Sequence, residues 1–97
     1  MRPIQKFEKK SGVLRLILYL YEEGETMLSS IWEGAAISIH QGYDSIDILK
    51  EYGLVKVRID QSSYPPRNMI SLTEKGRKVA KHLKEIEEIL GGEKHEQ

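Results

Sequence analysis

The chain of 97 residues contains no cysteine, so neither disulfide bonds nor thiol chemistry contribute to its stability or function. It has no basic-plus-apolar leader and no long apolar run, so we expect a cytoplasmic protein without a membrane partner. It also lacks a glycine-rich phosphate loop and a serine in a glycine-flanked elbow, so we expect neither enzymatic activity nor a cofactor.

Histidines are few and scattered, which argues against a metal centre. His40, His82 and His95 are far apart in the chain, and His82 shares a helical face with the acidic residue Glu85. Two such side chains could hold a metal, but on an exposed charged face they are usually solvated. We therefore expect no metal site.

The length allows one small domain whose core is marginal unless further apolar surface is buried, commonly by dimerisation. The net charge is zero, but the charges are segregated along the chain. Residues 1–21 and 52–84 are basic, whereas residues 22–51 and the tail after Lys84 are acidic.

Residues 24–73 follow a continuous pattern of turn, short helix, break, helix and two strands. Ser38 is expected to cap a helix, since its oxygen accepts a backbone N–H of the first turn. Gly53 ends that helix with a left-handed conformation. The expected elements are helices over about 10–23, from Leu28, over 38–52 and over about 74–90, with strands over 55–60 and 69–72.

The two strands and the loop 61–68 between them form a hairpin that we call the wing. Apolar Val55, Val57 and Ile59 alternate with polar residues, which indicates a half-buried strand. The segment 71–77, Ser-Leu-Thr-Glu-Lys-Gly-Arg, then resembles the strand-to-helix junction of MarR-like and PadR-like winged-helix regulators of prokaryotes and archaea. The resemblance extends over roughly four fifths of the chain.

The resemblance implies a mostly α protein with a small β-hairpin wing, a winged helix-turn-helix with an added C-terminal dimerisation helix. We divide the chain into a basic N-terminal arm (1–9), a winged helix-turn-helix domain (10–73), the dimerisation helix (74–90) and a disordered acidic tail (91–97). The implied function is a DNA-binding transcriptional regulator, a dimer that binds double-stranded DNA through the helix from Ser38 and the wing. A small-molecule effector stays open.

The candidate DNA-binding residues lie on that helix and on the wing. Gln41 is the clear candidate for base reading, because the helix offers no outward Arg or Lys. The carboxylates of Asp44 and Asp47 would be repelled by DNA phosphates unless they accept a hydrogen bond from cytosine or pair with a neighbouring Arg. The basic residues of the wing have two possible roles. They contact DNA phosphates, or they only keep an ordinary solvated hairpin soluble. The full set is Ser38, His40, Gln41, Tyr43, Lys56, Arg58, Tyr64 and Arg67.

The acidic character of the same helix supports an alternative function. A winged helix also serves as a protein–protein interaction module, and an acidic motif helix suits docking to a protein partner. The basic arm and wing favour DNA, and the acidic helix beside Trp32 favours the protein partner.

The last helix carries apolar residues at the spacing of a coiled-coil seam, four, three and four residues apart. Because the helix over 10–23 is apolar on all sides, it is expected to be buried on all sides, which needs a partner chain. Alternatively, the seam covers its own domain. The candidate dimerisation residues are Leu14, Leu18, Val79, Leu83, Ile86 and Leu90.

Trp32 and Gly42 depart from the pattern of the motif, which usually has alanine at the first position and a branched apolar residue at the second. We expect the indole of Trp32 to fill the space above Gly42, a volume-conserving exchange between two helices. Alternatively, Trp32 lines an effector pocket.

Overall fold

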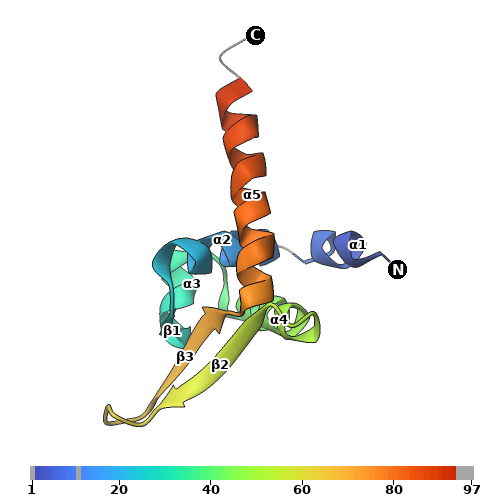
Figure 1. Ribbon diagram of the computed structural model, residues 1–97. Coiled ribbons are helices and arrows are strands. Elements are labelled where there is room, and N and C mark those ends of the chain that lie inside the picture. The colour runs from blue at the N-terminus through green and yellow to red at the C-terminus, as the bar shows by residue number, and fades with distance from the viewer. Residues whose placement is uncertain (1, 11, 94–97) are drawn as a thin grey trace.

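The computed structural model describes residues 2–10 and 12–93. Figure 1 shows a small body of helices from which the wing extends to one side and the last helix, α5, stands away at the opposite end. The expected class, mostly α with a small β-hairpin wing, is confirmed. The elements are α1 (Pro3–Glu8), α2 (Val13–Glu23), β1 (Thr26–Met27), the 3-10 turn η1 (Leu28–Ser30), α3 (Ile31–Gly34), α4 (Ile39–Glu51), β2 (Val55–Asp60), β3 (Arg67–Leu72) and α5 (Glu74–Glu93).

The sheet has three antiparallel strands in the order β1-β3-β2. The β2–β3 register runs from Val55 opposite Leu72 to Asp60 opposite Arg67, so β3 begins two residues before the expected Met69. The loop of the wing is therefore 61–66. Strand β1 could not be predicted from the sequence, because a strand of two residues is too short to show an alternating pattern.

The core lies where α2, α4 and the base of the sheet meet. Ile46 and Leu49 of α4 face it as expected, at 4% and 0% exposure. The wing leaves this core toward its tip: Val55 is buried, Val57 is half-buried and Ile59 is exposed. The expectation of a half-buried strand is therefore correct for its first half only.

Local signals fixed the ends of α4. Ser38 caps the helix, since its hydroxyl oxygen accepts the backbone N–H of Gln41 at 3.1 Å. Gly53 has φ +70°, as expected for a glycine that ends a helix. Both predictions are confirmed.

Three helix boundaries differ from expectation. Within the expected arm, residues 3–8 are helical, because Pro3 suits a first turn and Gln5 accepts the N–H of Arg2 at 3.0 Å. Helix α2 begins at Val13, three residues after Lys10. Helix α5 continues past Leu90 to Glu93, so the expected disordered tail is helical over 91–93; residues 94–97 lie outside the described part.

Helix α2 is buried on one side of this single chain. Val13, Leu16, Ile17 and Leu20 are buried, whereas Leu14 is 45% exposed. A single chain thus covers one side of α2, and burial of the other side by a partner chain stays a prediction. Among residues 2–10 and 12–93, no helix is long and apolar enough to cross a membrane.

The junction between β3 and α5 is held by side-chain and backbone hydrogen bonds. The Thr73 hydroxyl donates to the carbonyl oxygen of Gly53 at 2.6 Å and accepts the N–H of Gly76 at 3.0 Å. The Lys75 ammonium donates to the carbonyl oxygen of Tyr52 at 2.9 Å. These contacts attach the start of α5 to the end of α4 and so orient the two helices.

Candidate nucleic-acid interface

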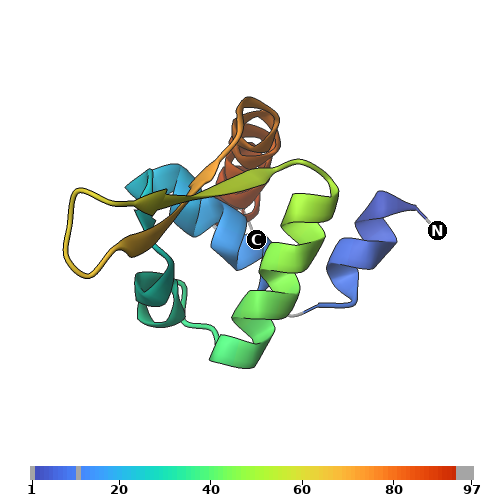
Figure 2. The ribbon, with the colours of Figure 1, turned by 90° about the horizontal axis from the view of Figure 1, so that it is seen from below.

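Helix α4 and the wing lie at the end of the molecule opposite the free end of α5 (Figures 1 and 2). The outward residues His40 and Tyr43 are exposed, Tyr43 to 52%. Ile39, the first helical residue, is 57% exposed as well. Ile39 is not among the predicted DNA-binding residues, although its position four residues before Tyr43 places both on one helical face.

Two of the candidate DNA-binding residues also hold the start of α4. Ser38 accepts from Gln41 as described, and the Gln41 side-chain oxygen accepts the backbone N–H of Ser38 at 3.4 Å. This capping box stabilises the helix terminus. Gln41 is exposed, but the capping contact fixes the direction of its amide group and occupies one of the two lone pairs with which its oxygen could accept from adenine.

The N-terminal segment neutralises acidic residues of α4. Figure 2 shows α1 beside α4, where Phe7 packs edge-on against Tyr52 with ring centroids 5.5 Å apart. Lys6 pairs with Glu51 at 2.9 Å, and this hydrogen bond raises the pKa of Lys6. Lys10 pairs with Asp44 at 3.6 Å. Asp44 is thus paired with a basic residue, a Lys in place of an Arg, and such pairing is one of the two conditions under which it was expected to be compatible with DNA binding.

His40 adds a second neighbour to the same carboxylate, with Nε2 3.5 Å from Asp44 Oδ2. Asp47 remains exposed on the outer face. The basic N-terminal segment favours DNA, and phosphate contacts of Lys6 and Lys10 stay a prediction; in the single chain both ammonium groups already pair with carboxylates of α4.

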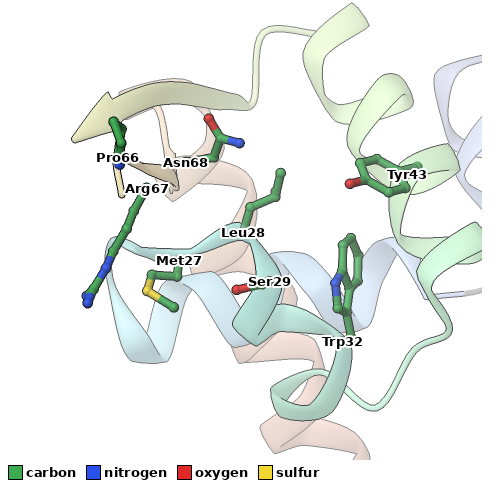
Figure 3. Close-up of a pocket in the computed structure, with 8 residues that line it drawn as sticks. All are labelled: Met27, Leu28, Ser29, Trp32, Tyr43, Pro66, Arg67 and Asn68. Atoms are coloured by element: carbon green, nitrogen blue, oxygen red, sulfur yellow. The ribbon is translucent and has the colours of Figure 1, made fainter. Parts of the chain in front are cut away.

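On the wing, the candidate basic residues differ in what they contact. Arg58 donates from Nε and Nη2 to the two carboxylate oxygens of Glu25, both at 2.7 Å. This bidentate hydrogen bond lowers the pKa of Glu25, which therefore stays ionised. Lys56, Arg67 and Tyr64 are exposed, Tyr64 to 98%. Arg58 must leave Glu25 to reach a phosphate, whereas Arg67 points outward (Figure 3).

An open cavity of about 260 Å³ lies between α4, the segment 27–32 and the end of β3 nearest the wing loop (Figure 3). One wall is aromatic: the rings of Trp32 and Tyr43 are 5.2 Å apart and tilted by 53°. The other wall is the start of β3. The lining residues are Met27, Leu28, Ser29, Trp32, Tyr43, Pro66, Arg67 and Asn68.

The indole of Trp32 fills the space above Gly42, as expected. Gly42 is buried, and a Cβ built on it would overlap Cζ3 of the indole. The exchange between α3 and α4 is therefore confirmed. Because Trp32 also lines the cavity, the effector-pocket alternative stays a prediction.

The candidate dimerisation residues divide into two groups. Val79 and Leu83 are half-buried and pack against the core of their own chain. Beyond them, Ile86, Ile89 and Leu90 are 52%, 55% and 69% exposed. On α2, Leu18 is half-buried and Leu14 is exposed. Of the apolar residues at coiled-coil spacing on α5, Val79 and Leu83 thus cover their own domain, whereas Ile86 and Leu90 are uncovered in the single chain.

His82 and Glu85 do meet on α5, with Nδ1 2.8 Å from Oε1. Within the described ranges, 2–10 and 12–93, no group of three or more His, Cys, Asp or Glu side chains is arranged to hold a metal ion.

Comparison with known proteins relates the chain to solved structures. No protein-family model matches it, and no curated protein matches it significantly. Apo ZitR from Lactococcus lactis is 27% identical, with a TM-score of 0.69 over 95% of this chain and 70% of that one. A transcriptional regulator homologue from Pyrococcus horikoshii is 22% identical, with a TM-score of 0.66 over 91% of this chain and 96% of that one.

A third structure contains nucleic acid. Streptococcus pneumoniae FabT in complex with DNA is 13% identical, with a TM-score of 0.73 over 87% of this chain and 58% of that one. At these identities the similarity supports a shared winged-helix fold, and the chain therefore has the fold of structures that include a DNA complex.

Proposed function

We propose that the protein is a transcriptional regulator that binds double-stranded DNA as a dimer, with α4 in the major groove and the wing beside it. One observation carries the proposal: α4 and the wing lie at the same end of the molecule, so that the exposed outer face of α4 is next to the basic residues of the wing. A MarR-like or PadR-like assignment is part of this proposal and rests on the junction 71–77.

The electrostatics of this end support DNA over a protein partner. The acidic face that favoured protein docking is weaker than the sequence suggests, because Asp44 and Glu51 pair with lysines of the N-terminal segment. Arg67 and Lys56 on the wing are exposed and have the charge that phosphate requires. We assign phosphate binding first to Arg67.

The function is tested by measuring affinity for random-sequence duplex DNA across a salt series. We expect binding that weakens steeply with salt, because phosphate contacts release counterions from DNA. Replacing Arg67 by alanine should weaken binding to all sequences and reduce the slope of log affinity against log salt by about 0.9 for each phosphate that is no longer neutralised.

Lys81→Ala is the matched control, since it removes one exposed positive charge from α5 away from the wing. An Arg67→Ala variant with the affinity and salt slope of the wild type would remove the wing from the interface. If the wild type fails to bind duplex DNA even at low salt, the protein-interaction alternative replaces the proposal.

Dimerisation through α5 is the second part of the proposal. Ile86, Ile89 and Leu90 form an exposed apolar face on the half of α5 that extends beyond the body (Figure 1). Such a face gains stability when a second copy covers it, by about 25 cal/mol for each Å² of apolar surface buried. We expect the α5 helices of two chains to pair along this face, and the exposed Leu14 on α2 stays a further candidate for the interface.

Replacing Ile86 by aspartate should convert the dimer into folded monomers, because a carboxylate in an apolar interface loses its hydration. Light scattering measures the mass and circular dichroism the helix content. Ile59→Asp is the control: Ile59 is 57% exposed, close to the 52% of Ile86, but lies on the wing. Equal masses for the two variants would contradict pairing through α5.

A further inference from the structure

Helix α4 presents an apolar pair at the end that would enter the major groove. Ile39 follows the cap Ser38 directly and Tyr43 follows one turn later, so the two side chains lie on the same face. They are 57% and 52% exposed. Among the described residues, Ile39 belongs neither to the buried core nor to the apolar residues packed against it.

Tyr43 is braced by its neighbours. Its ring lies 5.2 Å from that of Trp32, and the indole is itself held over buried Gly42. A side chain with such support keeps its orientation, so binding costs it less conformational entropy than a free side chain would lose. Tyr43 is therefore the preformed part of the apolar pair.

The rest of the outer face offers little for reading guanine or adenine. Residues 39–49 contain no Arg and no Lys, the residues that commonly bind guanine. Gln41, which suits adenine, has its amide oxygen in the capping contact with Ser38. The carboxylate of Asp44, a possible acceptor from cytosine, faces Lys10 and His40.

The major groove displays one apolar group on its base edges, the 5-methyl group of thymine. We infer that α4 recognises thymine through contacts of Ile39 and Tyr43 with these methyl groups, so that the protein prefers A·T-rich DNA. The inference rests on the proposed function, since it requires α4 in the major groove. Affinity then comes from phosphate contacts of the wing, and base preference comes from the apolar pair.

The test compares two duplexes of equal length, one of alternating dA and dT and one of alternating dA and dU. Uracil lacks the 5-methyl group but keeps the hydrogen-bonding groups of thymine in both grooves. We expect the dA-dU duplex to bind about fourfold more weakly for each methyl group that the protein buries on dA-dT, from a transfer free energy of ~0.8 kcal/mol per buried methyl-sized group.

Removal of the methyl group also changes how easily the duplex deforms, so a preference for dA-dT could come from DNA flexibility. Protein variants distinguish this cause from direct contact with the methyl groups. Ile39→Ala should reduce the preference for dA-dT over dA-dU severalfold. The matched control Ile59→Ala, at the same 57% exposure on the wing, should leave the preference unchanged. Because Ile39 is exposed, its truncation should leave the fold intact, which circular dichroism verifies.

The outcomes are distinct. Equal, salt-sensitive binding of both duplexes by the wild type would overturn the inference and leave the proposed function standing. A preference that persists unchanged in Ile39→Ala would assign it to DNA flexibility and also overturn the inference. Failure to bind either duplex at low salt would overturn the proposed function together with it.

Discussion

Replacing Gly76 by alanine is expected to lower the free energy of unfolding by about 3 kcal/mol, a large loss for a domain of this size. A Cβ at this position would overlap the carbonyl oxygen of Leu54. That oxygen belongs to the backbone and already accepts the N–H of Thr73 at 2.9 Å, so it cannot rotate away. Either α5 shifts or the junction loses its hydrogen bonds.

The melting temperature measures this effect, because about 3 kcal/mol corresponds to a decrease of roughly 12–24 °C in a domain of this length. Gly91→Ala is the matched control, since Gly91 lies on the same helix and a Cβ there would have no neighbour within 4 Å. Alanine is the better helix former, so the control should keep or slightly raise the melting temperature. Both variants are compared at one protein concentration, because dimerisation would couple stability to concentration.

Similar melting temperatures for the two variants would show that α5 tolerates a side chain against Leu54. In that case the glycine of the segment 71–77 serves another purpose than close approach. The control also excludes a general effect of removing glycine from α5.

Local patterns explain why much of the fold could be predicted from the sequence. The cap at Ser38 and the left-handed Gly53 depend on residues within one turn, and the apolar spacing of α4 is likewise visible in the chain. The contact of Trp32 with Gly42 was also predictable. Trp32 is larger than the alanine that is usual at its position in the motif, and Gly42 is smaller than the branched apolar residue that is usual at its own.

Long-range contacts could not be predicted in the same way. Arg58 and Glu25 are 33 residues apart, and no local pattern indicates that they form a bidentate ion pair. The pairing of Lys10 with Asp44 depends on how the N-terminal segment lies along α4. These contacts changed the interpretation of the site, because charged groups expected to meet DNA are held by other side chains.

The second large effect concerns Gly42, where the sign of a substitution should depend on Trp32. In the wild type, Gly42→Ala should destabilise the protein by about 2 kcal/mol, because the new methyl group overlaps the indole and the packing must shift. In a Trp32→Ala background the indole is absent. The same substitution should then stabilise the protein by up to about 1 kcal/mol, since alanine replaces glycine within a helix.

Chemical denaturation of the wild type, both single variants and the double variant completes a double-mutant cycle, with an expected coupling of about 3 kcal/mol. The Trp32→Ala variant is expected to lose stability by itself, because it leaves a cavity beside Tyr43. Additive effects would mean that the indole and Gly42 do not compete for the same space.

The same proteins test whether Trp32 also acts in DNA binding. In the double variant, alanine at Gly42 should restore part of the stability that Trp32→Ala removes, but the ring that braces Tyr43 is still missing. If the contact of Trp32 with Tyr43 is needed for DNA binding, Trp32→Ala should lower the preference for dA-dT over dA-dU. The preference should then stay low in the double variant while part of the stability returns. A preference that recovers together with stability would instead mean that Trp32 serves the fold alone, and that Tyr43 reaches its binding orientation without the indole.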